Sequence, residues 1–286
     1  MARLEDYDTT NQFVCEVKES TRISPGETEE VRDIILEVNN KDLVLEPGQS
    51  VGVIVPGPHG FGHKDHFRLY TIADIPKKTR GNKQLINICV RRCTYIDDFS
   101  GERYEGIASN YLCDLKPGDK LTMSGPYGIP FEVPDDKNAD ILMIGLGTGI
   151  APFRAFVKRI YNEVGGWKGK VRLFHGARSG LELLYMNDKQ NDFTNYYDEE
   201  TFKAFEAVSP RPQWDDPIAL DYALEERAEE VWKMVTSPDT YVFVAGQEKI
   251  KDMLDRAFEK MAGSKEKWER RKAELKAGKR WTEVIY

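Results

Sequence analysis

The sequence predicts a two-domain protein, an antiparallel β domain followed by an α/β domain with a parallel sheet. In the first half, short strand-like segments alternate with turns rich in Pro, Gly and Asp. In the second half, short apolar runs that end in Gly alternate with helical segments. The 286 residues are enough for two domains. The composition changes near residue 135, so we expect domains at 1–135 and 136–286, with PDDKNAD as the linker.

The first half carries the signals of an all-β domain. Its strand candidates are 13–23, 31–38, 50–56, 67–74, 85–93 and 120–128. Turn segments such as SPGETE, EPGQ and KPGD separate them. Regular spacing of short strands predicts a barrel or a sandwich. One helix is expected at 109–115, with Ser109 as its N-cap and Pro117-Gly118 beyond its end.

The second half carries the signals of a parallel sheet. Its strand candidates are 141–145, 171–176 and 241–246, and its helix candidates are 152–161, 220–235 and 248–261. Continuous apolar strands that alternate with helices indicate a sheet covered on both faces. Ligands of such sheets bind at the carboxyl ends of the strands, where all three strand candidates end in Gly.

Composition excludes several classes of function. The net charge of −7 argues against broad nucleic-acid binding. No apolar run approaches the roughly 18 residues of a membrane helix, and the polar, acidic start MARLEDYDTTNQ is unlike a targeting segment. We therefore expect a cytoplasmic protein. The cysteines Cys15, Cys89, Cys93 and Cys113 form no C-x-x-C pair and the four His are scattered, so we expect buried free thiols and no metal site.

The stretch GLGTGIAPFRAF, 145–156, is the strongest nucleotide signal. Gly145, Gly147 and Gly149 follow an apolar strand directly, and Pro152 suits the first turn of a helix. Glycines let backbone N–H groups approach a phosphate, and the helix N-terminus favours its negative charge. The pattern is G-x-G-x-G, with Ile150 in place of the third glycine of the dinucleotide-binding fingerprint. It predicts a pyrophosphate loop or, alternatively, a tight strand–helix turn.

The stretch FRLYTIAD, 67–74, does not alternate as a half-buried strand should. One interpretation is an edge strand with solvated polar residues. The other is a flavin site, in which Arg68 pairs with a pyrophosphate, Tyr70 packs on the ring system and the Thr71 hydroxyl reaches N5. The chain ends in RWTEVIY. Tyr286 is either a frayed terminal residue, or it is held by a last strand and covers a reactive ring.

Together these segments resemble the plant-type ferredoxin–NADP⁺ reductase family. The resemblance runs from about Val31 to Tyr286. Its marks are PGQSVGVIVP, RLYTIAD, CVRRCTY, GIASNYLCDLKPGD, GPYG, GTGIAPFRAF, ELLY, VFVAG and the final Trp281 to Tyr286. The resemblance implies a six-stranded antiparallel β-barrel that binds FAD, followed by an α/β domain that binds NADP(H).

The resemblance also implies site residues. For FAD they are Arg68, Leu69, Tyr70, Thr71, Cys89, Val90, Arg91, Tyr95, Gly106, Ile107, Ala108, Ser109 and Tyr286. For NADP(H) they are Gly147, Thr148, Gly149, Pro152, Arg178, Ser209, Arg211, Gly246 and Gln247. Tyr95 would stack on the FAD adenine, Gly106 to Ser109 would start a helix at the pyrophosphate, and Tyr286 would stack on the flavin. Thr71, Tyr286 and Glu283 are the catalytic candidates.

The sequence departs from the family pattern at several positions. Thr71 replaces a Ser, Ala245 a Cys, and Val284 a carboxylate, with Glu283 one position earlier. The stretch SPRPQ, with Ser209, Arg211 and Gln213, resembles the segment that binds the 2′-phosphate in the family. The ring expected over the adenine is missing, because the alignment puts Ala219 there. Arg178 favours a phosphate over a bare ribose.

The leading hypothesis is a flavoenzyme that passes electrons between NADP(H) and a one-electron carrier, ferredoxin or flavodoxin. One alternative is an NADPH-dependent FAD reductase that serves an oxygenase, and another is a nucleotide-binding regulatory protein without turnover. An acidic carrier would need a basic surface. The candidates for it are Lys77, Lys78, Arg80, Lys83, Arg91, Arg92 and the stretch 265–280.

Overall fold

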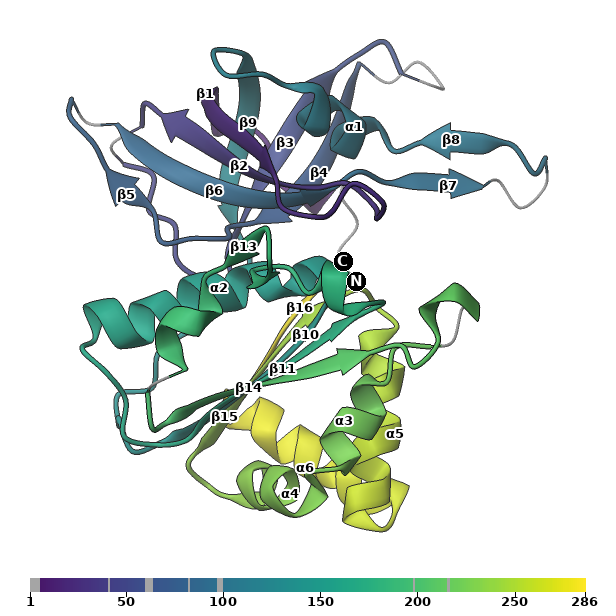
Figure 1. Cartoon of the computed structure of the whole chain (residues 1–286). Helices are drawn as coiled ribbons and strands as arrows, with labels where there is room; N and C mark the ends of the chain where they lie inside the picture. Colours follow the sequence, from purple (N-terminus) through teal and green to yellow (C-terminus); the bar gives the residue numbers. More distant parts are fainter. Residues whose placement is uncertain are drawn as a thin grey trace. The chain divides into compact units, whose positions relative to one another are not determined.

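A computed structural model describes residues 6–40, 42–59, 64–81, 83–96, 100–197, 199–214 and 217–286. The chain divides into unit 1, Met1–Pro130, and unit 2, Phe131–Tyr286. The prediction places this boundary between residues 135 and 136. Each unit has a core and a sheet of its own (Figure 1).

Unit 1 is built on antiparallel strands. Its main sheet has the order β4-β3-β9-β1-β2-β6-β5. The strands are β1 (Gln12–Arg22), β2 (Val31–Val38), β3 (Ser50–Pro56), β4 (Asp65–Thr71), β5 (Lys77–Lys78), β6 (Gln84–Arg91) and β9 (Lys120–Tyr127). The chain just beyond β4 also meets β6, because Ile72 pairs with Ile88 of β6, and the Ala73 N–H donates to the Asn87 carbonyl (2.8 Å). This closure confirms the predicted antiparallel barrel, with six strands in the ring and β5 as a short addition.

Apolar side chains from every strand of the ring fill the barrel. Val17, Ile34, Val53, Ile88 and Met123 are all fully buried. Burying such a side chain stabilises the fold by about 1.5–3 kcal/mol relative to exposure. Helix α1 (Ile107–Asp114) adds Ala108 and Leu112 to the same core and packs on β3, β4 and β6. The end of β4 is therefore held next to a helix.

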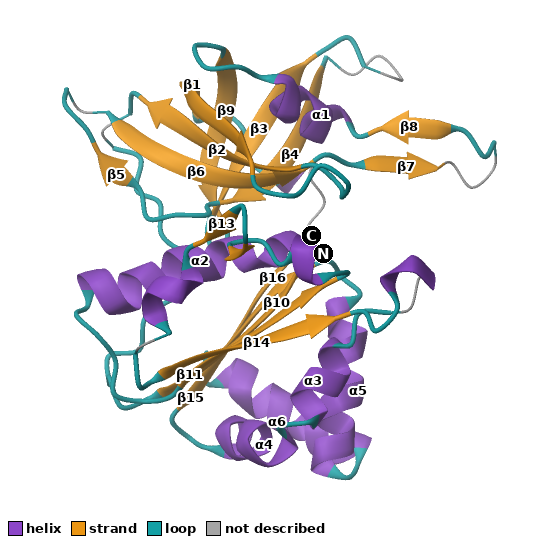
Figure 2. Ribbon diagram, in the orientation of Figure 1, coloured by secondary structure: helices purple, strands orange, loops and turns teal. Residues whose placement is uncertain are grey.

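A hairpin that the sequence did not predict leads into α1. Its strands are β7 (Thr94–Ile96) and β8 (Arg103–Glu105), and their side chains are exposed. Figure 2 shows this hairpin extending away from the barrel as a separate ribbon. Because it has no buried face, it carries no hydrophobic alternation from which a strand could be predicted.

Unit 2 is a parallel sheet in the order β14-β11-β10-β15-β16. The strands are β10 (Asp140–Leu146), β11 (Val171–Ala177), β14 (Phe202–Val208), β15 (Thr240–Gly246) and β16 (Trp281–Ile285). The chain first builds outward from β10 through β11 to β14, and then returns to add β15 and β16 on the other side. Such sheets bind ligands where the order reverses, here at the carboxyl ends of β10 and β15.

Helices cover both faces of the sheet (Figure 2). The helices are α2 (Ala151–Lys158), α3 (Leu220–Glu225), α4 (Ala228–Thr236), α5 (Ile250–Ala262) and α6 (Lys265–Ala277). Helices α3 to α6 enclose one core with Leu142, Ile144, Val242 and Val244 of the central strands. Helix α2 lies on the opposite face, where Phe156 packs against Phe243. This arrangement confirms the predicted α/β domain.

The remaining elements of unit 2 are short. They are the 3₁₀ turns Gly147–Ile150, Gly180–Glu182, Phe193–Tyr196 and Pro212–Trp214, the π-helical turn Arg159–Glu163, and the two-residue strands β12 (Met186–Asn187) and β13 (Gln190–Asn191). The predicted helix at 220–235 is two helices, since the chain breaks at Glu226 and Arg227. The break lets the Arg227 guanidinium lie over the Phe205 ring, 4.1 Å from its centroid.

Gly149 offers a test of the packing between the turn after β10 and the end of β15. A Cβ at Gly149 would lie 2.1 Å from the Ala245 carbonyl oxygen, which is backbone and cannot move aside. We expect Gly149→Ala to lower the free energy of unfolding of unit 2 by about 2 kcal/mol or more, because overpacking forces a backbone shift. Urea unfolding would measure it. Gly180→Ala is the control, since a Cβ there meets nothing within 4 Å. Equal stability of the two variants would contradict the packing argument.

Candidate functional site

In unit 1, β4 ends with the residues that the sequence predicts to hold a flavin. Arg68 is exposed, and its Nη1 donates to the Phe67 carbonyl (3.2 Å). Leu69 is half-buried, and Tyr70 packs against the barrel core. Burial raises the pKa of the Tyr70 phenol, so this ring stays neutral. The strand therefore presents an exposed cationic head group and a packed aromatic ring within three residues.

The hydroxyl of Thr71 has a partner that the sequence did not reveal. Ser50 lies opposite Thr71 in the β3–β4 ladder, and the two hydroxyl oxygens are 3.0 Å apart. Ser50 is buried. A hydroxyl has one donor and two acceptor positions. Thr71 can therefore hold this bond and still make one to a ligand, in an orientation that Ser50 fixes.

The start of α1 supplies backbone donors. The first intrahelical hydrogen bond runs from the Asn110 N–H to the Gly106 carbonyl (3.0 Å), so the N–H groups of Ile107, Ala108 and Ser109 lie ahead of it. The predicted N-cap at Ser109 is wrong, because the helix begins at Ile107 with Gly106 as N-cap. The Ser109 hydroxyl instead accepts from the Cys93 N–H (3.1 Å) and donates to the Gly106 carbonyl (3.2 Å).

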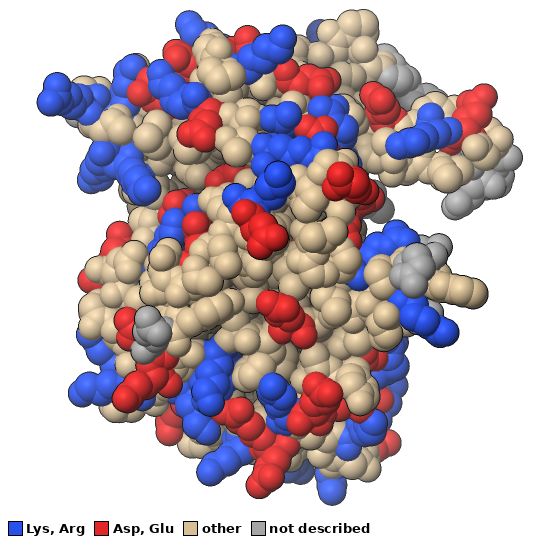
Figure 3. Space-filling view, in the orientation of Figure 1, with Lys and Arg blue, Asp and Glu red and all other residues tan. Residues whose placement is uncertain are grey.

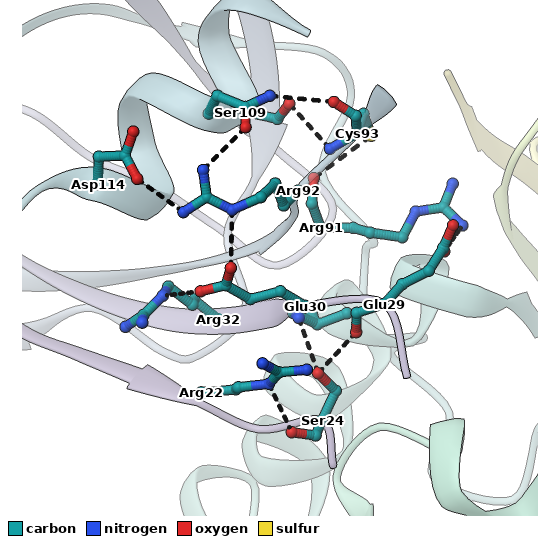
Figure 4. Close-up of polar contacts among 12 residues, drawn as sticks. Arg22, Ser24, Glu29, Glu30, Arg32, Arg91, Arg92, Cys93, Ser109 and Asp114 are labelled. Atoms are coloured by element: carbon teal, nitrogen blue, oxygen red, sulfur yellow. Dashed lines mark hydrogen bonds and ion pairs between the residues drawn. The ribbon is translucent and has the colours of Figure 1, made fainter. Parts of the chain in front are cut away.

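Arg92 ties α1 to the sheet (Figure 4). Its guanidinium donates to Asp114 (2.7 Å), to the Asn110 side-chain oxygen (2.8 Å) and to Glu30 (2.7 Å). The bond to Asp114 raises the pKa of Arg92 most; burial opposes it, and the bond to Glu30 adds to it. Arg92 is thus held in a network that connects helix and sheet, and this pairing weighs against its predicted role in docking. Lys83 is also paired, because its Nζ lies 2.8 Å from Glu37.

The other candidates in unit 1 divide between interior and surface. Cys89 and Val90 of β6 are buried, and Arg91 forms an ion pair with Glu29 (3.0 Å), as Figure 4 shows. Tyr95 is exposed and stacks on Tyr104 across the hairpin, with ring centroids 5.5 Å apart. Tyr104 is therefore a second ring at this position that sequence analysis missed.

The sequence predicts that all four thiols are buried, but one of them is exposed. Cys15, Cys89 and Cys113 are buried and Cys93 is exposed. Burial raises the pKa of Cys15 and of Cys113 to about 12. Cys93 lies at the start of the hairpin, where its carbonyl accepts from the Gly106 N–H (2.9 Å).

The donor set of unit 1 fits FAD. Cationic head groups and helix-start N–H groups suit a pyrophosphate, and aromatic rings suit flat ring systems. Arg68 and Arg91 supply the cations, α1 the N–H groups, and Tyr70, Tyr95 and Tyr104 the rings.

In unit 2, the predicted phosphate loop follows β10 as a 3₁₀ turn, Gly147–Ile150. Gly147 has a φ of +58°, and a Cβ there would meet nothing within 4 Å, so the loop is open on this side. Gly149 rests on the end of β15, and Pro152 lies in the first turn of α2. Gly246 ends β15 next to Leu146, and the Gln247 carbonyl accepts from the Ile250 N–H (2.9 Å) at the start of α5. An open glycine beside a helix start fits a nucleotide pyrophosphate.

The predicted 2′-phosphate residues come together at the ends of β11 and β14. Arg178 donates from Nη2 to the Pro212 carbonyl (2.9 Å), and its own carbonyl accepts from the Ser209 N–H (3.2 Å). Arg211 is exposed, and its carbonyl accepts from the Trp214 N–H (3.0 Å). The backbone of Gln213 lies in the same turn.

Trp214 is a candidate that sequence analysis missed. Its side chain is 74% exposed, three residues after Arg211. An exposed indole is unusual and indicates a binding surface. The sequence does not reveal this exposure, and the alignment put the adenine-covering position at Ala219, which is the N-cap of α3. Ser209, Arg211 and Trp214 thus lie in the segment that follows β14, and Arg178, which follows β11, is hydrogen-bonded to this segment. A hydroxyl, two cationic residues and an indole ring suit a phosphorylated adenosine.

Tyr286 is held over the loop from both ends. Its N–H donates to the Gly246 carbonyl (3.2 Å), and its hydroxyl hydrogen-bonds to the Thr148 hydroxyl (2.5 Å). The preceding residues form β16 on the edge of the sheet, which confirms the predicted last strand. The C-terminal ring therefore spans the carboxyl end of β15 and the glycine loop.

Glu283 points elsewhere. Trp281 Nε1 donates to its Oε1 (2.5 Å), and Lys276 of α6 lies 3.0 Å from the same oxygen. Burial raises the pKa of Glu283, but the bonds from Lys276 and Trp281 outweigh it and leave the pKa lowered. Neighbouring strand residues face opposite sides. Glu283 therefore faces α6 with Trp281, and this ionised, paired carboxylate is a poor candidate for proton transfer at Tyr286.

His175 lies under the glycine loop and was not a sequence candidate. It is fully buried near the end of β11, and its Nε2 is 3.2 Å from the Gly147 carbonyl oxygen. Burial lowers its pKa to about 4, although the hydrogen bond to Gly147 opposes this shift. The imidazole is therefore neutral at physiological pH.

Two further findings concern the described part of the chain. No group of three or more His, Cys, Asp or Glu side chains there could hold a metal ion. None of its helices combines the length and the apolar character needed to cross a membrane.

Comparison with known proteins gives two family matches. Residues 14–131 match the family described as oxidoreductase FAD-binding domain, and residues 143–256 match the oxidoreductase NAD-binding domain. The first match lies within unit 1 apart from its last residue, and the second lies within unit 2.

Curated relatives align over nearly the whole chain. The ferredoxin–NADP reductase of the Cyanophora paradoxa cyanelle is 34% identical over 92% of this chain and 72% of its own length. The Spirulina ferredoxin–NADP reductase is 31% identical over 92% of this chain and 91% of its own length. The chloroplastic ferredoxin–NADP reductase leaf isozyme 1 of Arabidopsis thaliana is 33% identical over 92% of this chain and 73% of its own length.

A solved structure shares the fold. Ferredoxin–NADP⁺ reductase from Plasmodium falciparum with 2′P-AMP superposes with a TM-score of 0.72 over 98% of both chains, at 17% identity.

The titration of His175 gives a prediction for acid stability. The neutral imidazole is favoured in the folded state, whereas the unfolded chain takes up a proton near the ordinary pKa of about 6.5. The folded state therefore carries no protonation penalty above pH 6.5, and the penalty grows as the pH falls towards about 4. Over that interval we expect a loss of about 3 kcal/mol, at 1.36 kcal/mol for each pKa unit.

Urea unfolding between pH 7 and pH 4.5 would measure this loss. Carboxylates titrate over the same interval, so His175→Leu is the reference protein. The unmodified chain should lose more stability on acidification than His175→Leu. Parallel pH profiles would show that His175 has the same pKa in the folded and unfolded states, which would contradict the prediction.

Proposed function

The chain belongs to the ferredoxin–NADP reductase family, and from that membership we propose that it transfers electrons between NADP(H) and ferredoxin through FAD. The observation that carries the proposal is the reach of the relatives, which align over 92% of the chain and so through both units. FAD, when bound, would supply the redox chemistry: uptake of a hydride from NADPH and release of the two electrons one at a time. The protein residues bind, orient and shield the reactants.

We propose that unit 1 binds FAD along the end of β4 and the start of α1. Arg68 and the α1 N–H groups would hold the pyrophosphate, and Tyr70 would pack on the ring system. Tyr95 would stack on the adenine, and Tyr104 stacks on the other face of Tyr95, with ring centroids 5.5 Å apart. Thr71 would donate to or accept from the flavin N5 edge, in the orientation that Ser50 sets (3.0 Å).

We propose that unit 2 prefers NADP(H) to NAD(H). Arg178, Ser209 and Arg211 would bind the 2′-phosphate, and Trp214 would cover the adenine in place of the ring that Ala219 lacks. The hydrogen bonds from Arg178 to Pro212 and from Trp214 to Arg211 support this, because they hold the turn together before any ligand arrives. The glycine loop would bind the pyrophosphate.

The role of Tyr286 towards the flavin stays a prediction. Its hydrogen bond to Thr148 places the phenol over the loop, where a nicotinamide nucleotide would bind. Two occupants cannot share that space, so we expect the ring to leave when NADP(H) enters. Glu283 also stays a prediction, and its pairing with Lys276 weighs against it.

For ferredoxin, the remaining docking candidates are Lys77, Lys78, Arg80, Arg91 and the basic helix α6. Lys77 and Lys78 form β5, and together with Arg80 they are exposed. Figure 3 shows Lys and Arg side chains gathered over this edge of unit 1. Several cations of α6 are paired with acids, such as Lys272 with Asp255 (2.7 Å). An oxygenase as the acceptor, and the cytoplasmic location, stay predictions.

Anaerobic stopped-flow reduction would test the function. We expect the FAD-loaded protein to be reduced by NADPH at least tenfold more efficiently than by NADH. It should then pass electrons to ferredoxin faster than to an oxygenase component. Trp214→Ala should raise the Kd for NADPH severalfold without changing the limiting rate, since base stacking contributes about 1–3 kcal/mol. Tyr197→Ala, at the other end of β14, is the control. A protein that binds FAD yet is not reduced by either nucleotide would refute the proposal.

Thr71→Val tests the flavin contact separately. It removes the hydroxyl and keeps the shape, so we expect the limiting rate of flavin reduction to fall about tenfold, with little change in the Kd for NADPH. Thr21→Val, on the exposed face of β1, is the matched control. An unchanged rate would show that Thr71 does not contact the reacting edge.

A further inference from the structure

His175 is a buried polar side chain that the proposed electron transfer does not use. It lies near the carboxyl end of β11, one strand away from the glycine loop, and is fully buried. The Gly147 carbonyl oxygen, 3.2 Å from Nε2, is its hydrogen-bond partner. A carbonyl oxygen only accepts, so Nε2 carries the proton and Nδ1 is the unprotonated nitrogen.

This arrangement costs stability. Nδ1 is buried and has no hydrogen-bond partner among the described residues. A buried acceptor without a partner destabilises a fold, whereas an apolar side chain of similar size does not. Leu173, two residues earlier on the same face of β11, is apolar and fully buried, so the environment suits an apolar residue. Packing alone therefore does not explain a histidine here.

The geometry of the loop supplies a reason. Gly147 has a φ of +58°, and its carbonyl is turned towards His175. In a trans peptide the C=O and the following N–H point in opposite directions. A Gly147 carbonyl held towards the interior therefore turns the Thr148 N–H outwards. The same turn is open at the position of a Gly147 Cβ.

We propose that His175 is a positioning residue, whose Nε2–H holds the Gly147 carbonyl and so directs the Thr148 amide at the pyrophosphate of a bound pyridine nucleotide. The inference rests on the proposed nucleotide site in unit 2. It adds a residue that would not touch the ligand, and it assigns that residue to the pyrophosphate and not to the 2′-phosphate end.

Calorimetric titration of the FAD-loaded protein with NADP⁺ tests the inference. We expect His175→Leu to bind NADP⁺ about tenfold more weakly and to be as stable as the parent at pH 7, or more stable. His175→Gln, which keeps an N–H at a similar reach, should recover most of the affinity. Adenosine 2′-monophosphate lacks the pyrophosphate, so its Kd should not change in either variant.

Thr240→Val is the matched control. Thr240 is also fully buried, and its hydroxyl has no partner among the described residues, but it lies at the amino end of β15. Removing that hydroxyl should leave NADP⁺ binding unchanged. Undiminished NADP⁺ affinity in His175→Leu would overturn the inference and leave the proposed function standing. An unmodified protein that fails to bind NADP⁺ would overturn both.

Nitrogen-15 NMR of the unmodified protein gives a second test that needs no substitution. The chain has four His, so the imidazole signals can be assigned. At pH 7 we expect the His175 signals of the Nε2–H tautomer, and a change at Nε2 when NADP⁺ binds. An Nδ1–H tautomer, or signals that NADP⁺ does not alter, would contradict the inference even if His175→Leu does not fold.

Discussion

The contact between Gly149 and the carbonyl of Ala245 is the constraint on which the nucleotide half of the molecule depends. The turn after β10 lies directly on the end of β15, with no space for a Cβ. This contact is possible only because the sheet order places β10 and β15 side by side. Once the turn is in place, Gly147 is open on its free side, the Thr148 hydroxyl meets Tyr286, and the loop carbonyl meets His175. The position of this one backbone contact therefore affects Gly147, Thr148, Tyr286 and His175.

In unit 1, a side chain and not a glycine holds the cofactor-facing segments together. Its helix start must stay next to the end of β4, although a hairpin without a core separates α1 from the barrel strands. Arg92 achieves this by bonding Glu30 of the sheet side and Asn110 and Asp114 of the helix. Charge-assisted bonds to two carboxylates are stronger than neutral ones. The cation that looked available for a partner on sequence grounds is therefore part of the scaffold.

The fold was predictable because its signals are local. Apolar runs ending in Gly marked β10, β11 and β15, and turn residues marked the barrel strands. β14 was missed because its buried residues, Phe202 and Ala207, do not alternate with exposed ones, and the β7–β8 hairpin was missed because its side chains are exposed. Residues within motifs, such as Thr71 and Gly147, were also identified as site candidates. Ser50, His175 and Trp214 were not identified. Ser50 and His175 each contact a partner that is distant in sequence, Thr71 and Gly147. Trp214 was missed because the expected ring position aligned with Ala219.

The exposure of a single thiol gives the molecule a natural point of attachment. Three of the four cysteines are buried, and burial strongly disfavours the thiolate of Cys15 and Cys113. Cys93 is exposed, and its carbonyl binds the residue that caps α1. A maleimide dye or spin label will therefore attach at one place without any engineering, beside the helix start that we assign to a cofactor phosphate. The unmodified chain carries its own reporter of cofactor loading.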